Sequence, residues 1–409
     1  MPPSPQSAGV LSFERAQELI QLHCQKLKPI GSESVAIEHA LNRVLAEPVL
    51  ADRDFPPFRR ATRDGYAVKA ADLSTIPATL GVMGQVKAGS NYQGIIQSRQ
   101  AVEIMTGAPI PEGADAVVMV EYTQPNGQQV EILRGVTAGE NIVAKGSEGK
   151  AGQEMLSAGT RMGFVQIAAA AAVGKSKLTC YQKPRVAILA TGDELVDLSV
   201  SPGPHQIRNS NSYSLAAQVL LAGGEPAPLP IVPDDKQALT ALIQKGLSAD
   251  LLLISGGVSM GQFDLVEEVL NTLGARFFFT GVHIQPGKPA VFGEALAKPF
   301  FGLPGNPVST MVTFDLFVRP VLEALSGGDP VRLPTAKARL SKAVKTKIGL
   351  TRFLPAVVRG GLYDPEVELV PWQGSGDILA AARANCYIVV PPDRDSIAAG
   401  EMVSILLRS

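Results

Sequence analysis

The amino-acid sequence predicts a multidomain α/β protein in which a doubly wound parallel-sheet domain is flanked by β-rich parts. Its 409 residues are enough for roughly two to four domains. Strand-like and helix-like segments alternate over 184–328, which is the pattern of a parallel sheet with helices on both faces. Short alternating runs broken by glycine and proline fill 51–144 and return over 329–409, as is typical of small β-rich domains.

The N-terminal part is expected to be helical after a frayed tail that is rich in proline and serine. Ser12 can cap a helix over about 13–27. A second helix is expected over about 38–45, and it has to end before Pro48.

The segment 51–144 is expected to consist of strands and turns. Its strand-like runs are 81–87, 101–105, 116–122 and 130–133. The last two flank Asn126-Gly127, a pair that is typical of the tight turn of a β-hairpin. Beyond this segment, an alanine-rich helix is expected around 166–173.

The doubly wound domain is predicted from strands and helices that follow one another. The expected strands are 186–190, 227–232, 251–254, 276–279 and 300–302, and the expected helices are 212–221, 235–247, 265–273 and 308–325. Asp234 or Asp235 opens the second helix, Asp264 caps the third, and Pro307 after Asn306 begins the fourth. Strands over 339–344, 367–370, 386–390 and 402–407 then predict a small C-terminal β-barrel or sandwich.

The composition excludes several classes of function. With 37 Lys and Arg against 38 Asp and Glu, the net charge is −1, so the chain lacks the basic footprint of a nucleic-acid-binding protein. Three cysteines and four histidines are scattered, which argues against zinc and disulfides and leaves Mg²⁺, with oxygen ligands, as the expected metal. Neither a membrane span nor a signal peptide is evident, and the expected compartment is the cytoplasm.

Two glycine-rich loops follow predicted strands, where a doubly wound fold places its ligand. In the loop 255–264, Gly256 and Gly257 can present backbone N–H groups to an anion, while Ser259 and Asp264 add a hydroxyl and a carboxylate. The spacing matches neither a dinucleotide-binding motif nor a P-loop. An ordinary strand-to-helix turn, with Asp264 as a helix cap, is about as compatible with the residues.

Other loops add weaker signals. The second glycine-rich loop, 302–309, opens a helix whose N-terminus favours anions. Glu194 follows a strand, Lys288 lies between two prolines, Asp64 lies in a turn, and Thr106 follows another strand. Each can also be a structural or solvated residue. Together they indicate an enzyme or binder of an anionic, phosphorylated small ligand.

The motifs together resemble the MoeA family of molybdopterin molybdenumtransferases, whose eukaryotic counterpart is the C-terminal domain of gephyrin. The matching stretches are DGYAV (64–68), IMTGAPIPEGADAVV (104–118), ATGDEL (190–195), SGGVSMGQFD (255–264), PGKPAVFG (286–293), GLPGNPVS (302–309) and WQGSGDI (372–378). The SGGVS motif is shared with MogA-type adenylyltransferases and CinA-like proteins, whereas its combination with DGYAV, MTGAP and LPGNP is specific to MoeA-like chains.

The resemblance implies that adenylylated molybdopterin and molybdate bind, that molybdenum is transferred to the dithiolene, and that AMP is released with the assistance of Mg²⁺. The residues that it implies for catalysis are Asp64, Thr106, Glu194, Asp264 and Lys288. Those that it implies for substrate binding are Asp234, Gly256, Gly257, Ser259, Pro304, Asn306, Pro307, Arg352 and Ser375. Three of the carboxylates, Asp64, Glu194 and Asp264, are the Mg²⁺ ligands that it implies.

The resemblance also implies four domains and a homodimer. Residues 1–50 and 145–183 would form a discontinuous linking domain, 51–144 the β-rich domain, 184–328 the MogA-like domain and 329–409 the C-terminal β-barrel. The active site would be shared between two subunits, and the enzyme would meet a molybdopterin adenylyltransferase transiently. No membrane or nucleic-acid partner is expected.

The sequence departs from the family pattern at a few positions. Arg59, Arg60 and Arg63 form a basic stretch where many members have Asp-Asn-Ser-Ala-Met. The segment Gly146-Ser147-Glu148 stands where members typically have Gly-Glu-Asp, and Glu148 is the substitute for the acidic residues of that motif. Gln285 replaces a lysine that often precedes PGKP. The three arginines can reflect lineage variation in a solvated loop, or they can form a rim of the site that attracts anions more strongly. Alternative functions are a paralogue for another oxyanion such as tungstate, a MogA-like adenylyltransferase, or a non-catalytic cofactor carrier or scaffold.

Overall fold

The computed structural model describes residues 9–257, 265–330, 334–361 and 363–408. These residues belong to two compact units, which we call the large unit and the small unit. The large unit comprises Met1–Ala46, Gly159–Gly163 and Leu178–Ser409, and the small unit comprises Glu47–Ala158 and Phe164–Lys177. The four-domain division that the resemblance implies stays a prediction.

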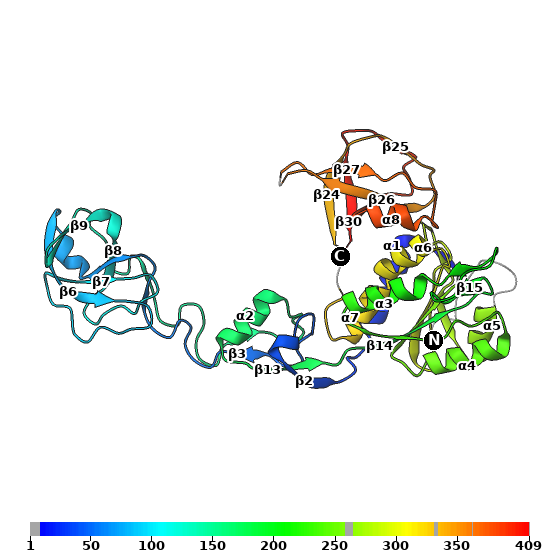
Figure 1. Cartoon of the computed structure of the whole chain (residues 1–409), viewed down its shortest axis with the longest axis horizontal. Helices are drawn as coiled ribbons and strands as arrows, with labels where there is room; N and C mark the ends of the chain where they lie inside the picture. Colours follow the sequence, from blue (N-terminus) through cyan, green and yellow to red (C-terminus); the bar gives the residue numbers. More distant parts are fainter. Residues whose placement is uncertain (1–8, 258–264, 331–333, 362, 409) are drawn as a thin grey trace, which may run out of the picture. The chain divides into compact units, whose positions relative to one another are not determined.

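The small unit is built around one six-stranded sheet, drawn in blue to cyan in Figure 1. Its strand order is β8 (Ala116–Met119), β5 (Gly65–Val68), β7 (Gln100–Ile104), β6 (Ala78–Val86), β10 (Gln129–Ile132) and β9 (Thr123–Asn126). Two apolar clusters lie against this sheet, one around Val102 and Val117 and the other around Leu80 and Val118. A hairpin is present near the predicted place, but its first strand is β9 rather than 116–122, and Gly127 and Gln128 form its turn in place of Asn126-Gly127.

Short ladders and one helix complete the small unit. The ladders pair β3 (Val49–Leu50) with β12 (Glu154–Leu156) and β4 (Arg60–Ala61) with β11 (Ile142–Val143), and the helix is α2 (Phe164–Ala172). Two 3₁₀ turns, η2 (Ala70–Leu73) and η3 (Val120–Tyr122), flank the sheet strands. The predicted alanine-rich helix is therefore present and begins two residues earlier than expected.

The large unit contains the predicted doubly wound sheet. Its order is β17 (Glu225–Pro228), β14 (Arg185–Ala190), β18 (Leu251–Ser255), β23 (Lys298–Leu303), β22 (Val291–Ala295) and β19 (Arg276–Phe279). The first four strands are parallel, whereas β22 runs antiparallel to both of its neighbours, so the sheet is mixed at one edge. Leu296 and Ala297, both with positive φ, form the tight turn that reverses the chain between β22 and β23.

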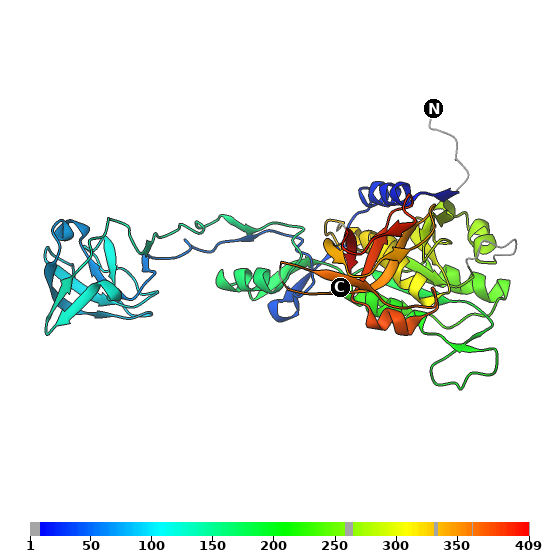
Figure 2. The same ribbon diagram turned by 90° about the horizontal axis from the view of Figure 1, so that it is seen from above.

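Helices cover both faces of this sheet because alternate residues of its strands point to opposite sides. Ile188 and Leu253 face α1 (Phe13–Cys24), α3 (Asn211–Leu221), α6 (Pro307–Thr313) and α7 (Arg319–Leu325). Leu189 and Leu252 face α4 (Lys236–Gly246) and α5 (Leu265–Thr272). Figures 1 and 2 show the two groups of helices around the sheet.

The C-terminal part of the large unit is a closed β-barrel, drawn orange to red in Figure 1. Its order is β21 (Ile284–Gln285), β26 (Thr351–Arg359), β27 (Glu366–Leu369), β24 (Thr335–Leu340), β30 (Met402–Leu407) and β28 (Cys386–Val390), and β28 returns to pair with β26. Helix α8 (Ile378–Arg383) lies beside it. Strand β21 lies in the chain between β19 and β22 of the doubly wound sheet, but it pairs with β26 of the barrel.

The remaining elements of the large unit are short. They are β1 (Val10–Leu11), β2 (Ser32–Ala36), η1 (Ile37–His39), β13 (Lys177–Tyr181), β15 (Leu195–Val196), β16 (Ile207–Arg208), β20 (Gly281–Val282), η4 (Phe314–Val318), β25 (Val344–Lys345) and β29 (Ser396–Ile397). In the described part of the chain, no helix combines the length and the apolar character that crossing a membrane requires.

Several predicted elements differ from the structure: the strand expected over 339–344 is β24, which begins and ends earlier, and the run 116–122 is divided into β8 and η3. The helix expected over 38–45 was wrong, because the N–H groups of Asn42 and Leu45 bond to the carbonyls of Met162 and Thr160 instead of forming a helix. The long helix expected over 308–325 is interrupted by the π-helical turn η4, which precedes Pro320, a residue that cannot donate a helical hydrogen bond. The strand expected over 227–232 is β17, which begins and ends earlier.

Candidate active site

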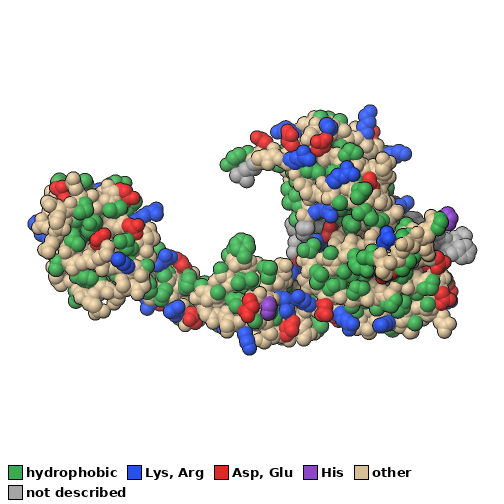
Figure 3. All heavy atoms as spheres, viewed as in Figure 1, with side chains coloured by type: hydrophobic (Ala, Val, Ile, Leu, Met, Phe, Trp, Pro, Cys, Tyr) green, Lys and Arg blue, Asp and Glu red, His purple; other side chains and the backbone are tan. Residues whose placement is uncertain are grey.

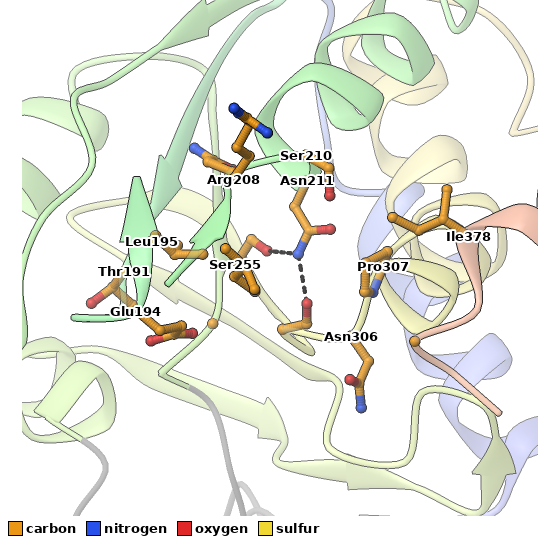
Figure 4. Close-up of a pocket in the computed structure, with 15 residues that line it drawn as sticks. Thr191, Glu194, Leu195, Arg208, Ser210, Asn211, Ser255, Asn306, Pro307 and Ile378 are labelled. Carbon is orange, nitrogen blue, oxygen red and sulfur yellow. Dashed lines mark hydrogen bonds between the residues drawn. The ribbon is translucent and has the colours of Figure 1, made fainter. Parts of the chain in front are cut away.

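The larger of two neighbouring cavities has a volume of about 550 Å³ and lies at the carboxyl ends of β14, β18 and β23. This is where a doubly wound sheet is expected to bind its ligand. Figure 4 shows the side chains that surround it. The cavity is lined by Thr191, Glu194, Leu195, Ile207, Arg208, Asn209, Ser210, Asn211, Ser255, Gly256, Gly305, Asn306, Pro307, Gly376 and Ile378.

Gly256 and Gly257 are required by close packing at the end of β18. Both have positive φ, and a Cβ atom at Gly256 would lie 2.4 Å from the carbonyl oxygen of Thr191. The N–H of Gly256 donates to the carbonyl of Leu303, 3.2 Å away. In this conformation the N–H of Gly256 holds two loops together, and the predicted contact of Gly256 with an anion stays a prediction.

Asn211, the first residue of α3, links the two glycine-rich loops. Its Nδ2 donates to Ser255 Oγ and to the carbonyl of Gly305, both at 2.8 Å (Figure 4). Its Oδ1 is buried and has no hydrogen-bond partner among the residues that the structure describes. Asn209, the residue before the N-cap Ser210, accepts through its Oδ1 from the N–H of Ser212 in the first turn of α3.

The carboxylates of this site come from two loops. Glu194 lines the larger cavity and lies against Gly192, where a Cβ atom would be 2.5 Å from Glu194 Oε2. Asp234 Oδ1 accepts from Thr191 Oγ1 at 2.9 Å, and Asp235 caps α4 by accepting from the N–H of Ala238. Ser259 and Asp264 lie outside the described residues. Within the described ranges, no group of three or more His, Cys, Asp and Glu side chains could hold a metal ion.

The smaller cavity, of about 320 Å³, lies on the other side of the loop 303–309. Three sequence-predicted residues, Lys288, Pro304 and Ser375, line it, and Asn306 lines both cavities. Its other lining residues are Ile284, Gln285, Pro286, Gly287, Pro289, Ser309, Leu350 and Trp372. The carbonyl of Ser375 accepts from the N–H of Val308, which joins the barrel side of the cavity to the start of α6.

Arg352 is fixed beside the smaller cavity by its neighbours. Its Nε donates to Gln285 Oε1 at 2.9 Å, and its Nη1 donates to the carbonyls of Leu350, at 3.1 Å, and Lys347. Burial lowers the pKa of the Arg352 guanidinium. Gln285 and Leu350 line the cavity, so the cation lies directly behind two of its walls.

Asp64 and Thr106 form a separate cluster in the small unit, just before β5 and just after β7. Asp64 Oδ1 accepts from the N–H of Thr106 at 2.6 Å and from its hydroxyl at 2.9 Å. These hydrogen bonds lower the pKa of the Asp64 carboxyl, because they stabilise its charged form. The predicted pair is thus brought together, with the Asp64 carboxylate exposed to solvent.

The arginines near Asp64 differ in their environments. Arg59 donates to the carbonyl of Ala114 at 2.6 Å, and Arg60 forms an ion pair with Glu148 at 3.0 Å. Arg63 is exposed, and its side chain has no hydrogen bond or ion pair with any residue that the structure describes. Arg59 and Arg60 therefore form contacts that stabilise the small unit.

Comparisons with known proteins cover nearly the whole chain. The model of the MoeA N-terminal region (domain I and II) matches residues 11–174, that of a probable molybdopterin binding domain matches 187–324, and that of the MoeA C-terminal region (domain IV) matches 337–407. A molybdopterin molybdenumtransferase of a Nostoc species is 36% identical over 388 residues, covering 92% of this chain and 88% of its own. One of Bacillus subtilis is 35% identical over 402 residues, covering 95% and 93%.

Solved structures of MoeA proteins also match this chain over nearly its full length. Two structures of the molybdopterin biosynthesis MoeA protein from Pyrococcus horikoshii match with TM-scores of 0.73 and 0.78, at 34% and 29% identity. They cover 97% and 98% of this chain and 99% and 100% of their own chains. The domain models, the full-length relatives and these structures agree with the motifs quoted above, and the chain belongs to the MoeA family of molybdopterin molybdenumtransferases.

Proposed function

We propose that this chain inserts molybdate into adenylylated molybdopterin and releases AMP, as a step of molybdenum cofactor biosynthesis. The observation that carries the proposal is the pair of cavities on either side of the loop 303–309, with Asn306 lining both. A reaction between a large and a small anionic substrate requires two adjoining sites of different size. The larger cavity fits a nucleotide-linked pterin in volume, and the smaller fits a tetrahedral oxyanion.

The charges near the cavities support this assignment. Lys288 is the cation that lines the smaller cavity, Arg352 lies behind its wall, and no described residue of its lining is a carboxylate. Molybdate carries two negative charges and hydrogen-bond acceptors, which the hydroxyls of Ser309 and Ser375 and the ammonium of Lys288 can bind. In the larger cavity, Arg208 offers a cation to a phosphate.

We further propose that Mg²⁺ assists the reaction. The carboxylate oxygens of Glu194, with Asp264 and Asp64, are the donors that Mg²⁺ prefers, and Glu194 lines the larger cavity. Bound there, Mg²⁺ would neutralise charge on the phosphoric anhydride and increase the electrophilicity of its phosphorus. Asp234, bonded to Thr191, holds the adjoining loop, and the loop of Gly305 and Asn306 keeps the anhydride between the two cavities.

We also propose that the protein is a homodimer whose active site combines residues of both subunits. Helix α2 is apolar except for Gln166, yet only Ala170 is buried, and Phe164 is 83% exposed. Figure 3 shows a projection of hydrophobic side chains over α2. Helix α3 of the large unit exposes Tyr213, Leu220 and Leu221. Apolar faces of this kind mark protein–protein contacts, and a second copy of the chain is the partner that the family resemblance implies.

The test is to incubate the purified protein with adenylylated molybdopterin, Mg²⁺ and either molybdate or tungstate. We expect either oxyanion to stimulate the release of AMP, with molybdate the better substrate. If neither does so, the transferase function is wrong and the carrier alternative gains support. Formation of adenylylated molybdopterin from ATP and molybdopterin would favour the adenylyltransferase alternative, and a stronger response to tungstate would favour the paralogue for that oxyanion.

The expected partners and compartment remain predictions. A transient contact with a molybdopterin adenylyltransferase would deliver the adenylylated substrate. The cytoplasm is favoured because Cys24, Cys180 and Cys386 are all free and buried, as suits a reducing compartment.

A further inference from the structure

Gln285 and Arg352 are neighbours across a pair of parallel strands. Strand β21 pairs with β26 in a register that sets Gln285 opposite Arg352, and the two side chains are joined by the 2.9 Å hydrogen bond from Arg352 Nε to Gln285 Oε1. On its other edge, Arg352 Nη1 donates to the carbonyls of Leu350 and Lys347. A guanidinium is planar, so bonds at Nε and Nη1 fix both its position and its plane.

Arg352 is nearly buried and keeps its positive charge behind the wall of the smaller cavity. Nη2 has no hydrogen-bond partner among the residues that the structure describes, although Arg352 as a whole is only 6% exposed. A cation that is largely removed from water interacts more strongly with an anion than a solvated one does. Gln285 and Leu350, which accept hydrogen bonds from Arg352, both line the smaller cavity, so these bonds determine where the charge of Arg352 lies behind the cavity wall.

The side chain at position 285 determines whether the residue that holds Arg352 also preserves the positive charge of Arg352. An amide oxygen accepts from Nε without cancelling the positive charge of Arg352. A carboxylate would accept at the same place but would neutralise the cation, and a lysine would provide no acceptor and would repel it. With an amide at this position, Lys288 and Arg352 supply two positive charges, which match a tetrahedral dianion.

We propose that Gln285 is the positioning residue of Arg352 and that it sets the affinity of the smaller cavity for a tetrahedral dianion. This inference rests on the proposed function, in which the smaller cavity takes the oxyanion. It assigns to Gln285 a role that the sequence did not indicate, since the sequence showed only that Gln285 replaces a lysine.

The experiment compares Gln285→Ala and Gln285→Glu with the unchanged protein. We expect Gln285→Ala to raise the KM for molybdate about tenfold, the effect of losing roughly 1.4 kcal/mol of binding free energy. Gln285→Glu should raise it further, about a hundredfold, because the anchor is kept while the charge is cancelled. The KM for adenylylated molybdopterin should stay within about twofold of the unchanged value in both variants, since its cavity is not altered.

Two controls separate this role from a structural one. Gln128→Glu makes the same change of charge in an exposed turn of the small unit and should leave every parameter unchanged. A double variant with Arg352→Ala and Gln285→Ala should bind molybdate no more weakly than Arg352→Ala alone, because Gln285 acts through Arg352. An additive loss in the double variant would show that Gln285 acts independently and would overturn the proposal.

The decisive comparison is between glutamate and glutamine at position 285. If Gln285→Glu binds molybdate like the unchanged protein while Gln285→Ala is impaired, the neutral amide at position 285 does not set the affinity for the dianion, and the proposal is wrong. Titration of the protein with molybdate alone, followed by calorimetry, measures the same ranking without turnover. Failure of the proposed function would appear as an absence of AMP release in the unchanged protein, a result distinct from an unexpected ranking of the variants.

Discussion

Asn211 connects the two loops that form the larger cavity, and its replacement should impair the reaction more than the fold. Asn211→Ala removes two hydrogen bonds, each worth about 1 kcal/mol, but also removes a buried oxygen that has no partner among the described residues. We therefore expect the free energy of unfolding to change by no more than about 1–2 kcal/mol. The loops lose their link, so kcat/KM should fall at least about tenfold.

Asn211→Asp provides the contrast, because it has nearly the same shape but opposes a carboxylate to the carbonyl of Gly305. It should lower both stability and activity. Urea denaturation and steady-state kinetics on the two variants measure these effects. Full activity of Asn211→Ala would show that the link between Ser255 and Gly305 has no part in catalysis.

Thr106 should control the pH range in which Asp64 is charged. Its two hydrogen bonds lower the pKa of the Asp64 carboxyl, so Thr106→Ala should raise that pKa toward its ordinary value. The backbone N–H remains in the variant, so the change is partial. If the charged form of Asp64 acts in the reaction, the acidic limb of the pH profile of kcat/KM moves to higher pH in Thr106→Ala. An unmoved limb would exclude Asp64 as the group that titrates there.

At the scale of elements, two neighbouring aspartates perform different tasks at the start of α4. Asp235 caps the helix, and Asp235→Ala should lower the free energy of unfolding by about 1 kcal/mol with activity retained. Asp234 bonds to Thr191 at the edge of the larger cavity, and Asp234→Ala should reduce activity with a smaller loss of stability. Denaturation curves and kinetics of both variants, with Asp235→Asn as the conservative control, distinguish the tasks. A loss of activity in Asp235→Ala equal to that in Asp234→Ala would contradict this division.

Elements with a strong local signal could be predicted from the sequence. The apolar run Leu251–Ser255 and the cap at Asp235 produced a strand and a helix close to their expected bounds. The segment 38–45 does not form its expected helix, because its backbone N–H groups bond to residues more than 100 positions away in the sequence. No local sequence pattern reveals such hydrogen bonds. The antiparallel strand β22 was also missed, since Leu296 and Ala297 are not residues typical of a tight turn.

The site was predictable to the extent that its motifs are contiguous. Glycines and prolines of the two loops, and the residues Glu194 and Lys288, were assigned from their own segments, and the structure places them around two adjoining cavities. The tasks of Asn211 and Gln285 depend on hydrogen bonds that span 44, 94 and 67 positions of sequence. Their local sequences show a helix start and a proline-rich loop, so only the folded chain reveals these contacts.

At the scale of the whole molecule, α2 should be part of the contact between two chains. Phe164 is 83% exposed on an apolar helix, and Phe164→Glu would bury a charge in such a contact. We expect the mass measured by light scattering to fall from that of two chains to that of one. Phe58→Glu, at another exposed aromatic residue of the small unit, serves as the control and should remain dimeric. A dimeric Phe164→Glu variant would exclude α2 from the interface.

A shared active site predicts that two inactive variants restore each other. Asp64→Asn changes the small unit and Glu194→Gln changes the large unit, so a mixed dimer would contain one site with both changes and one with neither. With random exchange of subunits, about half of the dimers are mixed, and activity should recover to about a quarter of the unchanged value. The double variant mixed with Asp64→Asn should recover nothing. If separately tagged chains form mixed dimers without recovery, each active site lies within a single chain.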